Sequence, residues 1–335
     1  MKKKIFAVCD TEAEYTRRFC EYVTGKREYP FEVAAFTSPE KLKQFCANED
    51  VEVLLVSESA YDVTLKELVK GEVIVLREEE AELTACGSIY KYQPCESVLR
   101  EMMCYCAKRG LESDAFIKTG KKTQVQMIGL YTPVHRCMQT SFAVTLGEIL
   151  AKEHRVLYLN FESFSGLERL LQQEFMTDMS DLIYYVANAR EALVYKLQGM
   201  TQRIQNLDYI PPVFSYMDLA RITQEQWFLL FEEIERLTDY EYIILDLSEN
   251  MQGLFEILRR CSKVFTLFRE DAAALAKICQ YERLLMRTDY EDILEKSKKC
   301  KLPYIKNISF DPLQLTYGEL ADYIRRIIKE EFNGG

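Results

Sequence analysis

One segment of the chain, 129-GLYTPVHRCMQTSFAVTLGEIL-150, combines an apolar run, a turn and the start of a helix, an arrangement suited to binding phosphate groups. A helix starting near Gln139 would offer free backbone N–H groups and the positive end of its dipole to an anion, and Arg136 would add positive charge. The turn contains no lysine and no glycine, the residue that lets N–H groups converge on phosphate oxygens. We therefore expect weak nucleotide binding at most, and no efficient hydrolysis.

Polar side chains also end two apolar runs further along the chain. Asn160 and Glu162 close the run HRVLYLNFE, and Asp246 follows the apolar part of EYIILDLSEN. Ligands of open α/β sheets bind at the carboxyl ends of parallel strands, so these residues are candidates for the same site. The alternative is structural, with Asp246 capping the next helix and with Asn160 and Glu162 serving only the local fold.

The second half of the chain has the pattern needed to position these candidates. Between residues 125 and 335, short apolar runs alternate with helical periodicity, which predicts a mostly parallel α/β sheet. The expected strands cover 125–131, 154–162, 208–213, 241–250, 263–270 and 300–309. The expected helices cover 139–153, 222–239, 253–261, 271–287 and 316–332, and a largely helical region covers 166–205.

The first half predicts a separate domain of the same class. Residues 1–108 alternate strands and helices five times, so we expect a second parallel sheet with helices on both faces. Residues 109–124 carry charge, two glycines and little periodicity, which predicts a linker. The predicted fold is therefore α/β, with two doubly wound, mostly parallel sheets in domains 1–108 and 125–335. The expected strands of the first domain are 4–10, 31–38, 51–59, 71–78 and 88–95.

Composition excludes several classes of function. The chain has 335 residues, and its apolar runs are far shorter than the roughly 20 residues that span a bilayer. The apolar stretch near the N-terminus is too short for a signal peptide, so we expect a cytoplasmic protein. A formal net charge of -10 disfavours a broad electrostatic hold on nucleic acid. Eleven cysteines without a C-x-x-C pair, and only two histidines, give no zinc-site spacing.

The segment 139-QTSFAVTL-146 resembles the K-T-T-x-A-x-x-L part of the deviant Walker A loop in ParA/MinD-type ATPases. The resemblance implies that Thr140 matches the hydroxyl that ligates magnesium, and Ser141 the hydroxyl after it. The sequence departs from the family at five positions. Val134 and Gln139 stand where the family has lysine, and His135, Arg136 and Met138 stand where it has glycine.

Two further segments resemble the same family. In RVLYLNFESFSGL, Asn160 stands in the place of the aspartate that orients the attacking water, and Glu162 in the place of the next aspartate. In YEYIILDLSEN, which resembles the Walker B strand, Asp246 takes the magnesium-organising position. The resemblance thus implies a degenerate site for ATP, with Mg²⁺ held by Thr140 and Asp246. The implied nucleotide contacts are Arg136, Gln139, Thr140, Ser141, Asn160, Glu162 and Asp246.

The first hundred residues resemble the receiver domain of two-component response regulators. Asp10 matches one member of the family's acidic pair, and the aspartate that accepts phosphate is replaced by Val56 or Ser57. The lysine–proline pair that ends the fifth strand becomes Gln93-Pro94. A carboxylate is needed to attack and to coordinate the metal, so we expect no phosphorylation on aspartate.

A degenerate receiver domain ahead of a ParA/MinD-like domain resembles the TadZ/CpaE family of pilus localisation proteins. The resemblance implies a cytoplasmic homodimer that marks, at the inner face of the membrane or the cell pole, where the tight-adherence (Flp) pilus or secretion machinery is built. It also implies that ATP is used poorly or not at all, which favours a protein that is not an enzyme. Two alternatives stand: a slow ATPase of the ParA/MinD class, and a regulatory protein whose receiver-like domain binds a partner.

The last predicted helix, 316–332, is amphipathic. Its apolar stripe includes Ile324 and Ile327, and Arg325, Arg326 and Lys329 lie on the other side. Such a helix could bind an anionic membrane surface, or its apolar stripe could dock on the sheet of its own domain.

Overall fold

The computed structural model describes residues 4–25, 31–79, 87–109, 124–302, 311 and 314–332. The chain divides into two compact units. Unit 1 holds Met1–Lys118 together with Asn188–Met200, and unit 2 holds Thr119–Ala187 together with Thr201–Gly335. The predicted linker, 109–124, lies almost entirely outside the described residues.

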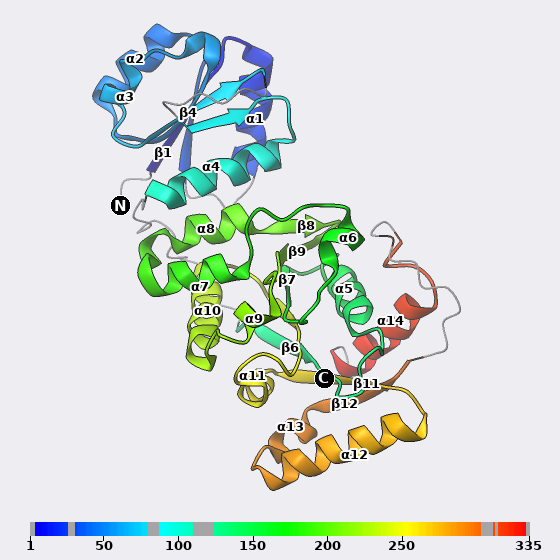
Figure 1. The fold of residues 1–335 in the computed structure, drawn as a ribbon. Coiled ribbons are helices and arrows are strands. Elements are labelled where there is room, and N and C mark those ends of the chain that lie inside the picture. The colour runs from blue at the N-terminus through cyan, green and yellow to red at the C-terminus, as the bar shows by residue number, and fades with distance from the viewer. Residues whose placement is uncertain are drawn as a thin grey trace. The chain divides into compact units, whose positions relative to one another are not determined.

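Unit 1 is built on a five-stranded parallel sheet in the order β2-β1-β3-β4-β5. Its strands are the blue and cyan arrows in Figure 1. This strand order is that of flavodoxin-like doubly wound sheets, in which ligands sit at the carboxyl ends of the strands. The strands are β1 (Lys4–Cys9), β2 (Phe31–Phe36), β3 (Val51–Ser57), β4 (Glu72–Arg77) and β5 (Gly87–Tyr90). The helices encoded before residue 118 are α1 (Ala13–Gly25), α2 (Pro39–Asn48), α3 (Leu65–Leu68) and α4 (Cys95–Arg109).

A helix from the middle of the chain completes unit 1. This helix, α8 (Leu193–Met200), packs along α4. A Cβ at Gly199 would lie 2.8 Å from Cys104 Sγ and 3.1 Å from the backbone oxygen of Arg100, so a larger residue would push the two helices apart. The Tyr195 ring stacks on Phe31 of β2 with 6.4 Å between centroids. Unit 1 is therefore assembled from two segments that are distant in the sequence.

Unit 2 is built on a seven-stranded sheet in the order β12-β11-β6-β10-β7-β9-β8, parallel except for the edge strand β8. Together the two sheets confirm the predicted fold class. The strands are β6 (Gln126–Leu130), β7 (Val156–Asn160), β8 (Gln202–Ile204), β9 (Leu207–Ile210), β10 (Tyr242–Asp246), β11 (Lys263–Phe268) and β12 (Ser297–Lys301). The helices are α5 (Gln139–Leu150), α6 (Leu167–Leu171), α7 (Met179–Asn188), α9 (Tyr216–Leu219), α10 (Gln224–Leu237), α11 (Leu254–Arg260), α12 (Ala272–Arg287), α13 (Glu291–Glu295) and α14 (Glu319–Glu331).

The region 166–205 is largely helical, as predicted, but its helices α6, α7 and α8 are short and it ends in strand β8. One expectation for this half of the chain needs correction. The strand expected at 300–309 is Ser297–Lys301, and residues 303–310 lie outside the described part of the chain. Its sequence, SKKCK, does not read as a strand because only Cys300 is buried. An edge strand tolerates exposed lysines, which protect it from pairing with other chains.

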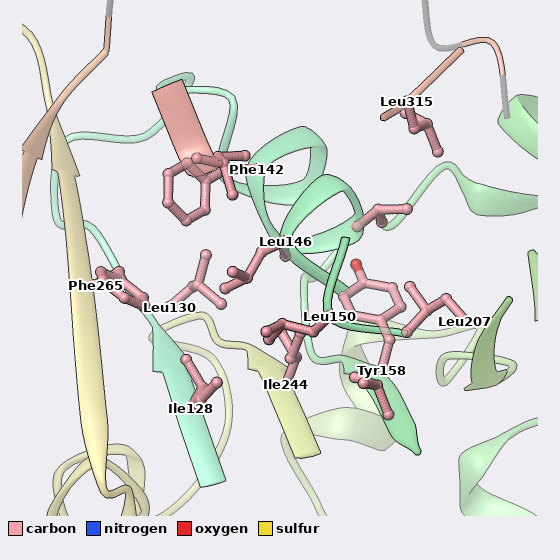
Figure 2. Close-up of a cluster of buried hydrophobic side chains, with 14 of the residues drawn as sticks. Ile128, Leu130, Phe142, Leu146, Leu150, Tyr158, Leu207, Ile244, Phe265 and Leu315 are labelled. Carbon is pink, nitrogen blue, oxygen red and sulfur yellow. The ribbon is translucent and has the colours of Figure 1, made fainter. Parts of the chain in front are cut away.

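The core of unit 2 gathers around α5. Figure 2 shows Phe142, Leu146 and Leu150 along this helix, with Tyr158 and Ile244 of the neighbouring strands nearby. All five side chains are buried in one hydrophobic cluster. This packing holds α5 against β7 and β10.

Helix α14 belongs to the same core. Its buried residues Ala321, Ile324 and Ile327 lie on the face that packs against α5. Of the two interpretations of the amphipathic 316–332 segment, the structure favours the docked one, since the apolar stripe is already covered. Within the described residues, no helix combines the length and apolar character needed to cross a membrane.

Candidate functional site

The turn between β6 and α5 keeps a backbone shape that glycine normally provides. His135, Arg136 and Met138 have φ angles of 60°, 49° and 57°. These are the three positions at which the ParA/MinD resemblance expects glycine. The left-handed region costs an ordinary L-residue roughly 1–2 kcal/mol. The turn thus stores strain at three sites, and such strain persists only where the surrounding structure fixes it.

Gln139, the first residue of α5, places its side-chain amide against the end of β10. Its Nε2 donates to Asp246 Oδ1 at 2.7 Å and to the backbone oxygen of Leu247 at 2.9 Å. Glu162 Oε1 lies further away, at 3.4 Å. The residue at the family's lysine position is therefore neutral, and its donors are used within the protein.

Asp246, the last residue of β10, is completely buried. Its Oδ2 accepts hydrogen bonds from Tyr158 Oη at 2.8 Å and from Asn160 Nδ2 at 3.0 Å. Burial raises the pKa of Asp246, while hydrogen bonds from Gln139, Thr140 and Tyr158 oppose that rise. Four donors therefore meet the approximately four acceptor positions of one carboxylate, and every donor is uncharged.

Tyr158 is the member of this cluster that the sequence analysis misses. It lies in β7, two residues before Asn160, and so points to the same side of the strand. Asn160 Nδ2 also donates to the Tyr158 oxygen at 2.7 Å, and Asn160 Oδ1 accepts from the backbone N–H of Glu162 at 2.9 Å. The sequence signal for this role was a tyrosine, with its polar hydroxyl, placed two residues before Asn160 at the end of the strand. A carboxamide does not take up a proton at neutral pH, so Asn160 cannot serve as a general base.

The remaining candidates surround this cluster. Glu162 is half-buried, and burial, with the nearby carboxylates of Asp246 and Glu249, raises its pKa to about 7. On the turn, His135 Nε2 lies 3.1 Å from Glu249 Oε1, and Arg136 is exposed. The site is thus rich in carboxylates. Thr140 and Ser141 are half-buried on the first turn of α5.

These residues do not fit a magnesium–triphosphate group. Mg²⁺ binds through carboxylate oxygens that are free to face it, whereas Asp246 is buried and its oxygens are occupied by protein donors. The implied pair of metal ligands, Thr140 and Asp246, is joined by a hydrogen bond instead. The neutral Gln139 cannot balance the charge of β- and γ-phosphates. Across the described residues, no group of three or more His, Cys, Asp or Glu side chains could hold a metal ion.

Unit 1 has its own polar cluster at the carboxyl ends of its strands, centred on Lys91. The Lys91 side chain is fully buried, and its Nζ lies 2.8 Å from Asp10 Oδ2 and 3.0 Å from Glu12 Oε1. Glu78 Oε1 is 3.6 Å away. Burial opposes the charge of Lys91, but hydrogen bonds to Asp10 and Glu12 prevail and raise its pKa.

The receiver resemblance predicts the lysine position at Gln93, whereas the buried lysine of this cluster is Lys91. This residue directly follows β5, two positions earlier in the chain. Ser57, at the end of β3, is buried, and its hydroxyl lies 3.1 Å from Ser59 Oγ. The ammonium group therefore neutralises the acidic residues after β1, Asp10 and Glu12. Ser57, with a hydroxyl, is one of the two residues that the receiver resemblance places at the phosphoacceptor.

Several solved structures resemble part of this chain in fold. A ParA family ATPase from Chlorobium tepidum TLS is 15% identical over 60% of this chain and 98% of its own, with a TM-score of 0.48. A putative plasmid partition protein from Borrelia burgdorferi B31, bound to AMPPNP, is 13% identical over 63% of this chain and 98% of its own, with a TM-score of 0.44. The MinC:MinD cell division protein complex of Aquifex aeolicus is 17% identical over 53% of this chain and 68% of its own, with a TM-score of 0.38. No protein-family model and no curated protein matches the sequence.

Proposed function

We propose that this protein is a scaffold, or polar localisation factor, for tight-adherence (Flp) pilus or secretion machinery. It acts as a cytoplasmic homodimer of the ParA/MinD type, at the inner face of the membrane or at the cell pole. It binds ATP weakly or not at all, and it is not an ATPase. The proposal joins the resemblance of the sequence to the TadZ/CpaE family with the chemistry of the two strand-end clusters.

The observation that carries the proposal is the hydrogen bonding of Asp246. In this cluster, Gln139, Tyr158 and Asn160 satisfy the carboxylate with neutral donors, and Asn160 cannot act as a base. These contacts support a protein that keeps the ATPase-like fold as a surface for binding other proteins and no longer hydrolyses ATP. The slow-ATPase alternative needs Arg136 or a residue of a partner subunit to replace the missing lysine, because Gln139 carries no charge.

Nucleotide titration and phosphate release test the absence of turnover. We expect no calorimetric binding of Mg·ATP tighter than about 1 mM, which corresponds to about -4 kcal/mol. We also expect no phosphate release above the buffer rate. The matched control is Asp246→Ala, which should behave like the natural protein in this assay. Phosphate release that disappears in Asp246→Ala would refute the proposal in favour of the slow ATPase.

Cell biology and hydrodynamics test the scaffold role. Sedimentation velocity should show a dimer at micromolar concentration without nucleotide. A fluorescent fusion should form a focus at the cell pole, and deletion of the gene should abolish surface pili without changing pilin levels. A monomeric protein spread evenly through the cell, with normal piliation after deletion, would contradict the proposal.

A further inference from the structure

Unit 2 exposes a group of large apolar side chains on three loops that follow β7, α6 and β9. Phe164, Met176 and Phe214 are 84%, 92% and 83% exposed. Tyr216 and Met217, at the start of α9, are exposed as well. We call these five residues the apolar loop patch.

The three loops are joined by short contacts. The rings of Phe164 and Tyr216 lie 5.8 Å apart between centroids. The backbone N–H of Phe214 donates to Asp178 Oδ2 at 3.1 Å, which ties the loop after β9 to the loop that carries Met176. The patch is therefore one surface formed by segments distant in the sequence.

The patch is not needed to complete the core of unit 2. In the same segments Leu167, Val213 and Leu219 are buried, so apolar residues that face the core do pack there. Moving one large apolar side chain from water into a packed site stabilises by roughly 1.5–3 kcal/mol. A cluster of such side chains left in water marks a binding surface, with aromatic residues as its anchors.

The charge around the patch indicates the nature of the partner. The segments that carry it, 161–181 and 211–221, contain six carboxylate side chains and two arginines. Arg221 and Asp218 pair with each other at 3.3 Å, which leaves five carboxylates and one arginine outside this pair. Lysine or arginine beside an apolar anchor would complement this surface. An anionic lipid surface would be repelled by it, and so would a second copy docked through the same patch.

We infer that the apolar loop patch docks a partner protein through a segment with aromatic or aliphatic anchors flanked by lysine or arginine. The inference rests on the proposed scaffold role, because it specifies the chemistry of the partner that the scaffold holds. Its failure can be told apart from a failure of that role, because phosphate release, sedimentation and piliation test that role without the peptides.

Two synthetic helical peptides test the inference on the full-length protein. Both have the same leucine and phenylalanine positions, and their remaining positions are lysine in one and glutamate in the other. Fluorescence anisotropy should show that the lysine peptide binds at least tenfold more tightly than the glutamate peptide. Phe164→Ser with Phe214→Ser should weaken binding of the lysine peptide at least tenfold, and so should Met176→Ser with Met217→Ser.

The control substitutes two exposed apolar residues of α12. Leu275→Ser with Met286→Ser should leave binding of the lysine peptide within twofold, because these residues lie outside the patch. Circular dichroism should give the same melting temperature for all variants, since each altered side chain is exposed. Equal binding of both peptides, or equal binding by the patch variants and the natural protein, would overturn the inference. So would a dimer that dissociates in the patch variants, or binding of the natural protein but not the variants to phosphatidylglycerol vesicles.

Discussion

In unit 1 the buried carboxylate at the strand ends, Asp10, faces the ammonium of Lys91 at 2.8 Å. In unit 2 the buried carboxylate in the comparable place, Asp246, faces neutral donors from Gln139, Tyr158 and Asn160. Both clusters lie where open α/β sheets bind their ligands. Each carboxylate is satisfied within its own unit, by charge in one case and by hydrogen bonds in the other.

The difference determines how each site responds when a group is removed. In a buried ion pair, each charge is neutralised by one partner, so removal of either partner leaves a buried charge without compensation. In a network of neutral donors, several hydrogen bonds together stabilise the carboxylate, so removal of one donor costs a single hydrogen bond. The two units should therefore differ in sensitivity to substitution, to pH and to backbone change.

The largest effect is expected from Lys91→Met. This change leaves the Asp10 carboxylate buried without its cation, and should reduce the stability of unit 1 by about 3–5 kcal/mol. Because two units unfold in one chain, hydrogen exchange resolved by unit in increasing urea is the suitable measurement.

The control for Lys91 is an exposed ion pair in the same unit. Lys70→Met removes the partner of Asp50, where both side chains are more than two-thirds exposed, and should cost at most about 1 kcal/mol. Adding Asp10→Asn to Lys91→Met should recover most of the loss. If Lys91→Met and Lys70→Met proved equally mild, Lys91 would not be the dominant charge of this site.

The next effect separates Asp246 from Asp10. Tyr158→Phe, which removes one of the four donors to Asp246, should cost only about 1 kcal/mol. Asp10→Asn should cost about 3 kcal/mol, because it leaves Lys91 buried with less compensation. The same hydrogen exchange experiment compares the two. Equal costs would mean that the two clusters do not differ in the way described.

A smaller effect concerns pH. The pKa of Glu162 is raised to about 7, mainly by burial and also by Asp246 and Glu249. The folded state therefore keeps a proton that the unfolded chain releases near pH 4.5, so stability falls as pH rises from about 4.5 to 7 and is level above that. Glu162→Gln should remove about 1–2 kcal/mol of this fall, after allowance for solvent screening.

Urea denaturation of unit 2 at pH 5 and pH 8 checks this expectation. Glu14→Gln in unit 1 is a suitable control, because that side chain is exposed and its pKa is lowered by Arg17 and Arg18. It should leave the difference between pH 5 and pH 8 unchanged. A Glu162→Gln protein that retains the full pH dependence would exclude Glu162 as its source.

The smallest effect tests strain in the turn before α5. Met138→Gly should stabilise unit 2 by about 0.5–1 kcal/mol, since glycine adopts the φ of 57° without a steric cost but loses more entropy on folding. Thermal melting should show a rise of a few degrees at most. The reverse sign is expected for Gly253→Ala, which has φ of 77°. A destabilised Met138→Gly protein would mean that packing of the methionine outweighs its backbone strain.

Local patterns in the sequence predicted much of the fold. Apolar runs marked nearly every parallel strand, since strands buried on both faces have little room for polar residues. The exception, β12, is an edge strand rich in lysine, and its pattern is set by exposure. Helical periodicity was visible around α8, but periodicity cannot show which unit a helix packs against. The need for glycine at position 199 becomes visible only when the position of α4 beside α8 is known.

The candidate site could be predicted in part. The rule that ligands bind at strand ends selected Asn160, Glu162 and Asp246, and the structure brings all three together with Gln139. Their roles in nucleotide binding remain predictions. Tyr158 was missed because a tyrosine in an apolar strand usually serves the core. Lys91 was missed because a motif was matched by its position in the sequence. The ion pair of Lys91 with Asp10 depends instead on where β5 ends in space.

Helix α8 has a consequence for protein synthesis. Unit 1 needs Asn188–Met200, so about 80 residues, most of them from unit 2, must be translated after Lys118 before the missing helix is complete. At roughly 5–20 residues per second, the ribosome takes on the order of 4–16 s to make them. Throughout that interval the face of α4 that α8 later covers is exposed on a nascent chain, and a chaperone that binds apolar surfaces would find its substrate there.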